Sequence, residues 1–292
     1  MFKKLTNLKL PGFMYRTHAI LSVVLMEICM LLPLNFLQTT FGTLKDNILL
    51  LIVCVVILIG GALFPDMDNF SSKGGNVLGP LGSIMTTFMQ STSSIVWNVY
   101  HFKADKKPMS QHRYLWHTPI IAIGLIVLFW FRLPAGNYTI FTNIKSSIEA
   151  NQLSYFVQTN AVLILFMILS FMATLIGSSI VLDKINKLVS VPKLIKYIFP
   201  VAVLVYIFTA SYTQLRMLGI CFGAGYLFHI IEDTFADSGV PLLFPIPVFW
   251  KNQVWARIKF PITAKTGGLT NTIIDFVAGI TVIILAVVIF TR

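Results

Sequence analysis

The sequence predicts an all-α membrane protein, a polytopic transmembrane helical bundle of about seven spans. Composition is the first reason, because 56% of the 292 residues are hydrophobic and the mean hydropathy is +0.81, values typical of membrane proteins. The second reason is that apolar runs recur at roughly the 20 residues that a helix needs to cross the hydrocarbon core. The alternating ten-residue segments of a barrel are lacking in the sequence. We therefore expect residues 1–292 to form a single integral membrane domain.

Seven apolar runs are expected to be the transmembrane helices: 18–37, 47–64, 118–132, 158–182, 197–213, 215–232 and 272–291. The second run should end before Asp66, because the Gly60–Gly61 pair and Pro65 favour a helix end there. In the third run, Pro119 suits the first turn of a helix. Residues 81–100 are also apolar, but Thr, Ser, Gln and Asn occur throughout them. We expect this segment to be an interfacial amphipathic helix or a re-entrant piece.

The basic residues are distributed unevenly, although the whole chain carries a net charge of +11. With seven spans and an internal N-terminus, 17 of the 22 Lys and Arg residues fall in inner segments. An excess of basic residues is typical of cytoplasmic loops, so the N-terminus is expected in the cytoplasm. The charges are spread over separate loops without a recognised nucleic-acid-binding motif. We expect membrane lipid, with anionic headgroups, as the partner and no nucleic acid.

The few acids and histidines gather at one side of the predicted membrane topology. Only 11 Asp and Glu and five His residues occur in the chain. "YRTHAI" opens the first span, "FPDMDN" closes the second, "SQHRYLWHT" precedes the third and "FHIIEDTF" closes the sixth. Polar residues at membrane depth are costly and indicate function. The sequence therefore predicts a shared cytoplasmic-face site made of His18, Asp66, Asp68, His112, His117, His229, Glu232 and Asp233.

The residue types in this predicted site suit a metal ion. His229 and Asp233 are four residues apart, so one helical face presents an imidazole and a carboxylate one turn apart. Asp66 and Asp68 would diverge on a helix but can both face inward in a turn. Imidazole and carboxylate ligands without thiolate suit a divalent metal, Zn²⁺ first and Mn²⁺ or Fe²⁺ as alternatives, with one or more ions bound. A metal-bound water would be the nucleophile, and Asp68 or Glu232 the general base.

Three segments resemble the YdjM family of predicted membrane-bound metal-dependent hydrolases, some of which are linked to LexA regulation: "LFPDMDN", "HRYLWHT" and "GYLFHIIEDTFADSGVPLLFP". Residues that match the family pattern are Thr17–His18, Pro65–Asp66 with Asp68, His112–Arg113 with His117, His229 with Asp233, and the loop 239–245. Motifs cover 13–120 and 217–250, whereas the helical segment 130–215 carries none. The chain departs from the pattern at Asn69, Trp116, Thr118 and Ala236, where the family tends to have His, Thr, Ser and Thr.

The resemblance and the residues together predict a hydrolase at the cytoplasmic face of the bacterial inner membrane. Its substrate would be an ester or phosphoester of a lipid or a lipid-linked molecule. A distant likeness to zinc-dependent phospholipases C and nucleases, a fold-level analogy, favours a phosphoester. Arg16 and Arg113 would bind the phosphate. The expected metal ligands are His18, Asp66, His112, His117, His229 and Asp233, with Asp68 or Glu232 as the base or as a group that supports the ligands.

Two other classes of protein stay open at this stage. A transporter of a metal or small solute could use the same residues, and Glu27, in the middle of the first span, favours that interpretation. The one-sided distribution of the clusters favours the hydrolase, because transporter sites usually lie near the midplane. The third class is a structural membrane protein with a stabilising metal. Any single cluster could be ordinary interfacial or capping residues, so the hypothesis depends on four clusters converging.

Overall fold

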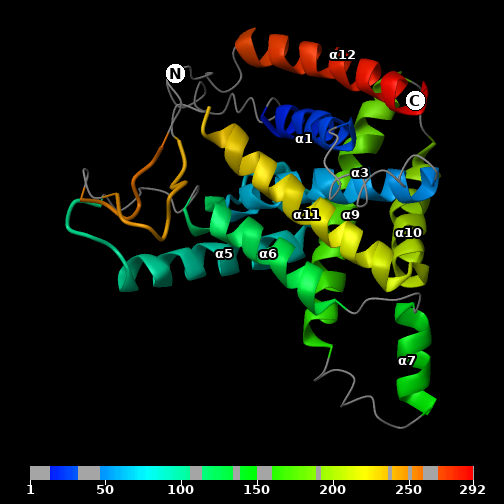
Figure 1. The fold of residues 1–292 in the computed structure, drawn as a ribbon, viewed down its shortest axis with the longest axis horizontal. Coiled ribbons are helices and arrows are strands. Elements are labelled where there is room, and N and C mark those ends of the chain that lie inside the picture. Colours follow the sequence, from blue (N-terminus) through cyan, green and yellow to red (C-terminus); the bar gives the residue numbers. More distant parts are fainter. Residues whose placement is uncertain are drawn as a thin grey trace, which may run out of the picture. The chain divides into compact units, whose positions relative to one another are not determined.

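The computed structural model describes residues 14–31, 47–105, 114–133, 139–149, 160–188, 192–235, 239–248, 252–258 and 269–291 (Figure 1). The α-helices are α1 (Met14–Leu31), α3 (Ile48–Leu63), α4 (Lys73–Leu78), α5 (Pro80–Val99), α6 (Pro119–Arg132), α7 (Ile140–Glu149), α9 (Ala161–Leu188), α10 (Lys193–Thr209), α11 (Tyr212–Asp233) and α12 (Leu269–Thr291). Two short 3₁₀-helices are η3 (Pro65–Asp68) and η4 (Leu115–His117). Within these residues, β-structure is limited to isolated bridges. The predicted all-α fold is confirmed.

Four described helices are long and apolar enough to cross a membrane: Ile48–Asp68, Ala161–Asn186, Tyr212–Asp233 and Thr272–Thr291. Shorter apolar helices occupy the other three predicted runs, namely Thr17–Leu31, Pro119–Arg132 and Ile198–Thr209. Residues 32–37 and 158–159 of the predicted runs lie outside the described residues. Transmembrane helices are therefore confirmed, and the count of seven spans stays a prediction. The segment expected to be amphipathic forms one helix, α5.

The chain forms two compact units, each assembled from segments that are distant in sequence. Unit 1 consists of Met1–Ile28, Pro65–Pro119 and Phe228–Arg292, and unit 2 of Cys29–Phe64 and Ile120–Leu227. Both units receive parts of α1 and α11, because the division falls inside these helices. That residues 1–292 make one integral domain stays a prediction.

Unit 2 is held together by helices whose backbones approach closely at glycines. A Cβ atom at Gly60 would fall on the backbone carbonyl of Ala173, which brings α3 against α9. A Cβ atom at Gly61 would fall on the backbone carbonyl of Phe222, so α3 also packs closely against α11. Small residues allow this approach between membrane helices. The expected end of the second run before Asp66 is confirmed, since α3 stops at Leu63, before Pro65, although Gly60 and Gly61 lie within the helix.

Unit 1 contains α4, α5, α12, the two 3₁₀-helices and the polar turns between them. The Thr17 hydroxyl donates a hydrogen bond to Asp275 at 2.7 Å, which joins α1 to α12. After α5, the Asp105 carboxylate accepts hydrogen bonds from the backbone N–H groups of Val254 and Trp255. A buried cluster of Trp97, Tyr114, Phe244, Val254 and Trp255 fills the space between these segments. This packing fixes the loops around the end of α5.

Candidate metal centre

The first part of the site is the turn that follows α3. Proline lacks a backbone N–H and suits the first turn of a new helix, and Pro65 opens the short 3₁₀-helix η3, which contains Asp66 and Asp68. The Asp68 side chain is fully buried, and that of Asp66 is partly exposed. Both carboxylates approach His117. The prediction that both acids can face inward from a turn is confirmed.

His117 lies in η4, immediately before α6, and its two ring nitrogens face different carboxylates. Its Nδ1 is 3.4 Å from Asp68 Oδ2, whereas its Nε2 is 3.6 Å from Asp66 Oδ1 and 3.5 Å from Asp233 Oδ2. A carboxylate beside one ring nitrogen fixes the tautomer and directs the other nitrogen toward a metal. The geometry therefore separates Asp66 and Asp233, on the Nε2 side, from Asp68, behind the ring.

The last two turns of α11 bring His229 and Asp233 to the same place. His229 Nε2 lies 3.4 Å from Asp233 Oδ2 and 3.6 Å from Asp66 Oδ1. It also lies 3.3 Å from His117 Nε2. The side chains of His117, His229 and Asp233 are fully buried. The spacing of four residues on one helical face thus produces the predicted imidazole–carboxylate pair.

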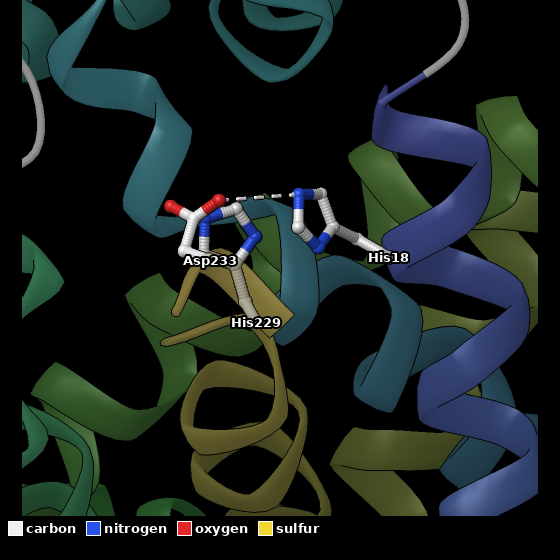
Figure 2. Close-up of side chains that lie close together, drawn as sticks. All are labelled: His18, His229 and Asp233. Carbon is white, nitrogen blue, oxygen red and sulfur yellow. Dashed lines mark ion pairs between the residues drawn. The ribbon is translucent and has the colours of Figure 1, made fainter. Parts of the chain in front are cut away.

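His18 enters this cluster from α1, as Figure 2 shows with His229 and Asp233. Its Nδ1 is paired with the Glu232 carboxylate, and its Nε2 lies 3.7 Å from Asp233 Oδ1. The rings of His18 and His229 are 4.0 Å apart between centroids. Glu232 thus stands behind His18 as Asp68 stands behind His117. The two predicted base candidates both contact the Nδ1 atom of a histidine.

The electrostatic balance at His117 favours a positive charge. Burial alone would lower the pKa of this imidazole, but the charge of Asp68, hydrogen bonds to Asp66 and Asp68, and the charge of Asp233 together raise it to about 9. A proton on His117 would occupy the position that a metal ion needs. The cluster therefore attracts a cation, whether a proton or a metal.

The donor atoms fit a divalent metal ion. Carboxylate oxygens and imidazole Nε2 atoms converge here, and each of them offers a lone pair to a cation. Two ligands of one tetrahedral Zn²⁺ ion, each about 2.0–2.2 Å from it, lie about 3.3–3.6 Å from each other. The separations among His117, His229, Asp66 and Asp233 given above span 3.3 to 3.6 Å. These spacings match those between ligands of one small cation.

Two groups of three residues could hold an ion: His18, His229 and Asp233, and Asp66, His117 and His229. The ligand atoms within each group all lie within 4.8 Å of one another. A neutral imidazole offers one lone pair, so His229 can serve only one ion. The two groups are therefore overlapping parts of one site.

The sequence predicted the helix at 81–100 but not that this helix supports the acidic turn. The Thr86 hydroxyl of α5 donates to the backbone carbonyl of Met67, and the Gln90 amide donates to that of Asp68 at 2.8 Å. The Trp116 indole N–H, next to His117, donates to the carbonyl of Met89 at 3.0 Å. The sequence signal was the hydroxyl and amide residues of 81–100, but their spacing did not show which would face η3.

Several other predicted residues are separate from this cluster. The Asn69 side-chain oxygen accepts hydrogen bonds from Ser71, so it closes the turn. Glu27 is buried farther along α1. His112 and Arg113 lie outside the described residues, and so does the Arg16 side chain at the start of α1. The ligand role of His112 and the phosphate-binding role of the two arginines stay predictions.

The whole-chain comparison agrees with the motifs. The family model described as YdjM inner membrane protein matches residues 13–194 and 190–292. The two matches extend over the segment 130–215, which carried no motif, as well as over every residue of the cluster. No curated protein and no solved structure matches the chain. The chain belongs to the YdjM inner membrane protein family.

Proposed function

We propose that this member of the YdjM family is a membrane-bound, metal-dependent hydrolase that acts on an ester or phosphoester of a lipid or lipid-linked substrate. The supporting observation is the convergence of three histidines and two ligand-type carboxylates from α1, η3, η4 and α11 in one buried cluster. Such residues are expensive to bury without a partner. A metal-dependent hydrolase uses this combination of a cation site and adjacent carboxylates.

The contacts suggest a division of roles within the cluster. His18, Asp66, His117, His229 and Asp233 would hold the metal, with His112 as a sixth ligand. Asp68 and Glu232 each stand behind a histidine and would fix its orientation. A bound ion would polarise the substrate oxygen and lower the pKa of a water. Either carboxylate could also accept a proton from that water, as the sequence suggested.

The membrane topology is part of the proposal. The four long apolar helices and the three shorter ones would make seven spans, with the N-terminus in the cytoplasm because basic residues predominate in the inner segments. The site would then lie at the cytoplasmic face of the bacterial inner membrane. Headgroups at this level carry phosphate, which Arg16 and Arg113 would bind.

Hydrolysis should be tested on the purified protein in vesicles of mixed phosphatidylcholine and phosphatidylglycerol. With Zn²⁺, Mn²⁺ or Fe²⁺ added, we expect release of a water-soluble headgroup or of a fatty acid. His229→Ala should abolish that release. The matched control is His101→Ala, because His101 is exposed and stacks on Trp97 away from the cluster. Equal turnover by wild type and His229→Ala would contradict the proposal.

A transporter is the second candidate, and the burial of Glu27 favours it. This carboxyl is only 7% exposed, in α1, nine residues beyond His18. A buried acid within a membrane helix commonly marks an ion pathway. Glu27→Gln should therefore abolish metal uptake into vesicles if the protein is a transporter. The same variant should retain hydrolysis if the interfacial cluster acts as an enzyme site.

A further inference from the structure

Helix α5 has three distinct faces. Gly82, Thr86, Met89, Ser93 and Trp97 are buried and point into unit 1. A second set is exposed and polar, made of Ser83, Thr87, Ser91 and Asn98. The third set is exposed and apolar, between 51% and 82% of each side chain being accessible, and consists of Leu81, Ile84, Phe88, Ile95 and Val99. At about 100° per residue, this last set falls within roughly 60° of the helix circumference.

The exposed apolar stripe of α5 (Leu81, Ile84, Phe88, Ile95 and Val99) suits lipid. The chain belongs to a family of inner membrane proteins, and an amphipathic helix at the bilayer surface buries such a stripe among acyl chains. Lys73 and Lys103 flank the helix in the sequence, as is favourable beside phosphate headgroups. The occupant to which these features point is therefore the bilayer.

The polar side of α5 lacks the charges that usually attract helices to anionic membranes. Residues 80–99 include no Asp, Glu, Lys or Arg, and the exposed polar side chains are hydroxyls and one amide. Insertion would then depend on apolar side chains entering gaps between lipids, which is the behaviour of lipid-packing sensors. Charged amphipathic helices respond mainly to anionic lipid.

The buried face of α5 is connected to the candidate metal centre. Thr86 and Gln90 hold the backbone of η3, and Trp116 of η4 donates to Met89 and to the Thr92 hydroxyl. Phe88, a member of the stripe, also contacts the Trp116 ring, with centroids 5.9 Å apart. Because of these contacts, a change in the depth of α5 in the lipid would alter the mobility of η3 and η4, the two turns that carry Asp66, Asp68 and His117.

We propose that α5 is a lipid-packing sensor, whose apolar stripe inserts into loosely packed bilayer and thereby steadies η3 and η4. Neither insertion nor the steadying of η3 and η4 depends on the proposed hydrolase function. Only an effect of insertion on turnover would rest on that function. The chemical partner is the acyl region of phospholipids in a neutral or anionic membrane.

The test places an environment-sensitive fluorophore on α5. Ile84→Cys is labelled in a Cys29→Ser background, because Cys54 and Cys221 are fully buried. The matched control is Ser83→Cys on the exposed polar face. Both proteins are reconstituted in dioleoylphosphatidylcholine, with or without cholesterol to tighten the packing, and with or without phosphatidylglycerol.

The label at position 84 should shift to the blue and be quenched several-fold more by brominated lipid than the label at 83. Cholesterol should reduce that difference, whereas phosphatidylglycerol should leave it nearly unchanged. Equal quenching of both labels by aqueous iodide would overturn the proposal. If insertion required phosphatidylglycerol, charge attraction and not lipid packing would control it, and the proposal would be wrong. Energy transfer between labelled copies would show that another copy of the protein covers the stripe, which would also overturn the proposal.

The coupling between α5 and the candidate metal centre is measured without metal or substrate, as the rate of amide hydrogen exchange in residues 65–72. Ile84→Ser with Ile95→Ser should make these amides exchange several-fold faster in loosely packed bilayers, whereas Thr87→Ala should not. Unchanged exchange in the double variant, despite lost insertion, would disprove the coupling. Absence of hydrolysis would count against the proposed function alone, because neither readout here depends on it.

Discussion

The two units of the molecule bury different kinds of polar residue. In unit 1 the buried polar side chains include His18, Asp68, His117, His229 and Asp233. In unit 2, among the described residues, they are three hydroxyls of α9: Ser170, Thr174 and Ser178. Helix backbones meet closely at glycines in both units, at Gly60 and Gly61 in unit 2 and at Gly82 in unit 1. Among the described residues, the buried histidines and carboxylates thus lie in unit 1 alone, so mutations in the two units should fail in different ways.

The largest expected effect is on the stability of unit 2. Gly60→Ala places a methyl group on the Ala173 carbonyl, and overpacking of this kind costs about 1–3 kcal/mol. Gly124→Ala is the matched control, because nothing lies within 4 Å of its new methyl group. That control should be neutral or stabilising by up to about 1 kcal/mol, since alanine favours helix. Thermal unfolding in detergent should show a lower midpoint for Gly60→Ala; equal midpoints would contradict the packing.

In unit 1, Asp68→Asn should weaken metal binding while the protein stays folded. The substitution keeps the side-chain volume but removes the charge behind His117 Nδ1. Loss of such a supporting partner typically lowers metal affinity about 10–100-fold. Competition titration with a chromophoric chelator measures this. Unchanged affinity would show that Asp68 does not orient the histidine.

Metal binding should weaken as the pH falls. The pKa of His117 is raised to about 9, so below that pH the ion must displace a proton from this ring. If one proton is released per ion, affinity should change by up to about tenfold per pH unit. Titrations between pH 6 and 8 should show tighter binding at the higher pH, with proton release into a weakly buffered solution. A pH-independent affinity would mean that His117 is not a ligand.

Thr86→Val should have the smallest effect. It removes the hydroxyl that donates to the Met67 carbonyl and keeps a similar volume. A neutral hydrogen bond contributes about 1 kcal/mol, so metal affinity should fall by a few-fold at most. Thr87→Val, on the exposed face of the same helix, should leave affinity unchanged. Equal metal affinities for both variants would show that the contact between α5 and η3 does not influence metal binding.

The sequence was sufficient to find the long helices and most of the cluster, but not the short helices α4 and α7, because long apolar runs and rare acids are local patterns. Apolar runs locate α3, α6 and α11 within a few residues, and rare acids stand out in so apolar a chain. It assigned Asp66 and Asp68 different roles, but it could not show which nitrogen of His117 each one faces. Gly60 shows an effect of tertiary packing that the sequence does not reveal. Glycine disfavours an isolated helix, but α3 needs glycine at this position because the backbone of Ala173 lies against it.

The most direct test is metal content by mass spectrometry of the detergent-purified protein, prepared without chelators. Wild type and His101→Ala should carry bound Zn²⁺, Mn²⁺ or Fe²⁺ in stoichiometric amounts. The double variant His229→Ala/Asp233→Ala should lose the metal while circular dichroism shows that it is still helical. Wild-type protein without metal, or a folded double variant that retains it, would contradict the assignment of this cluster as a metal centre.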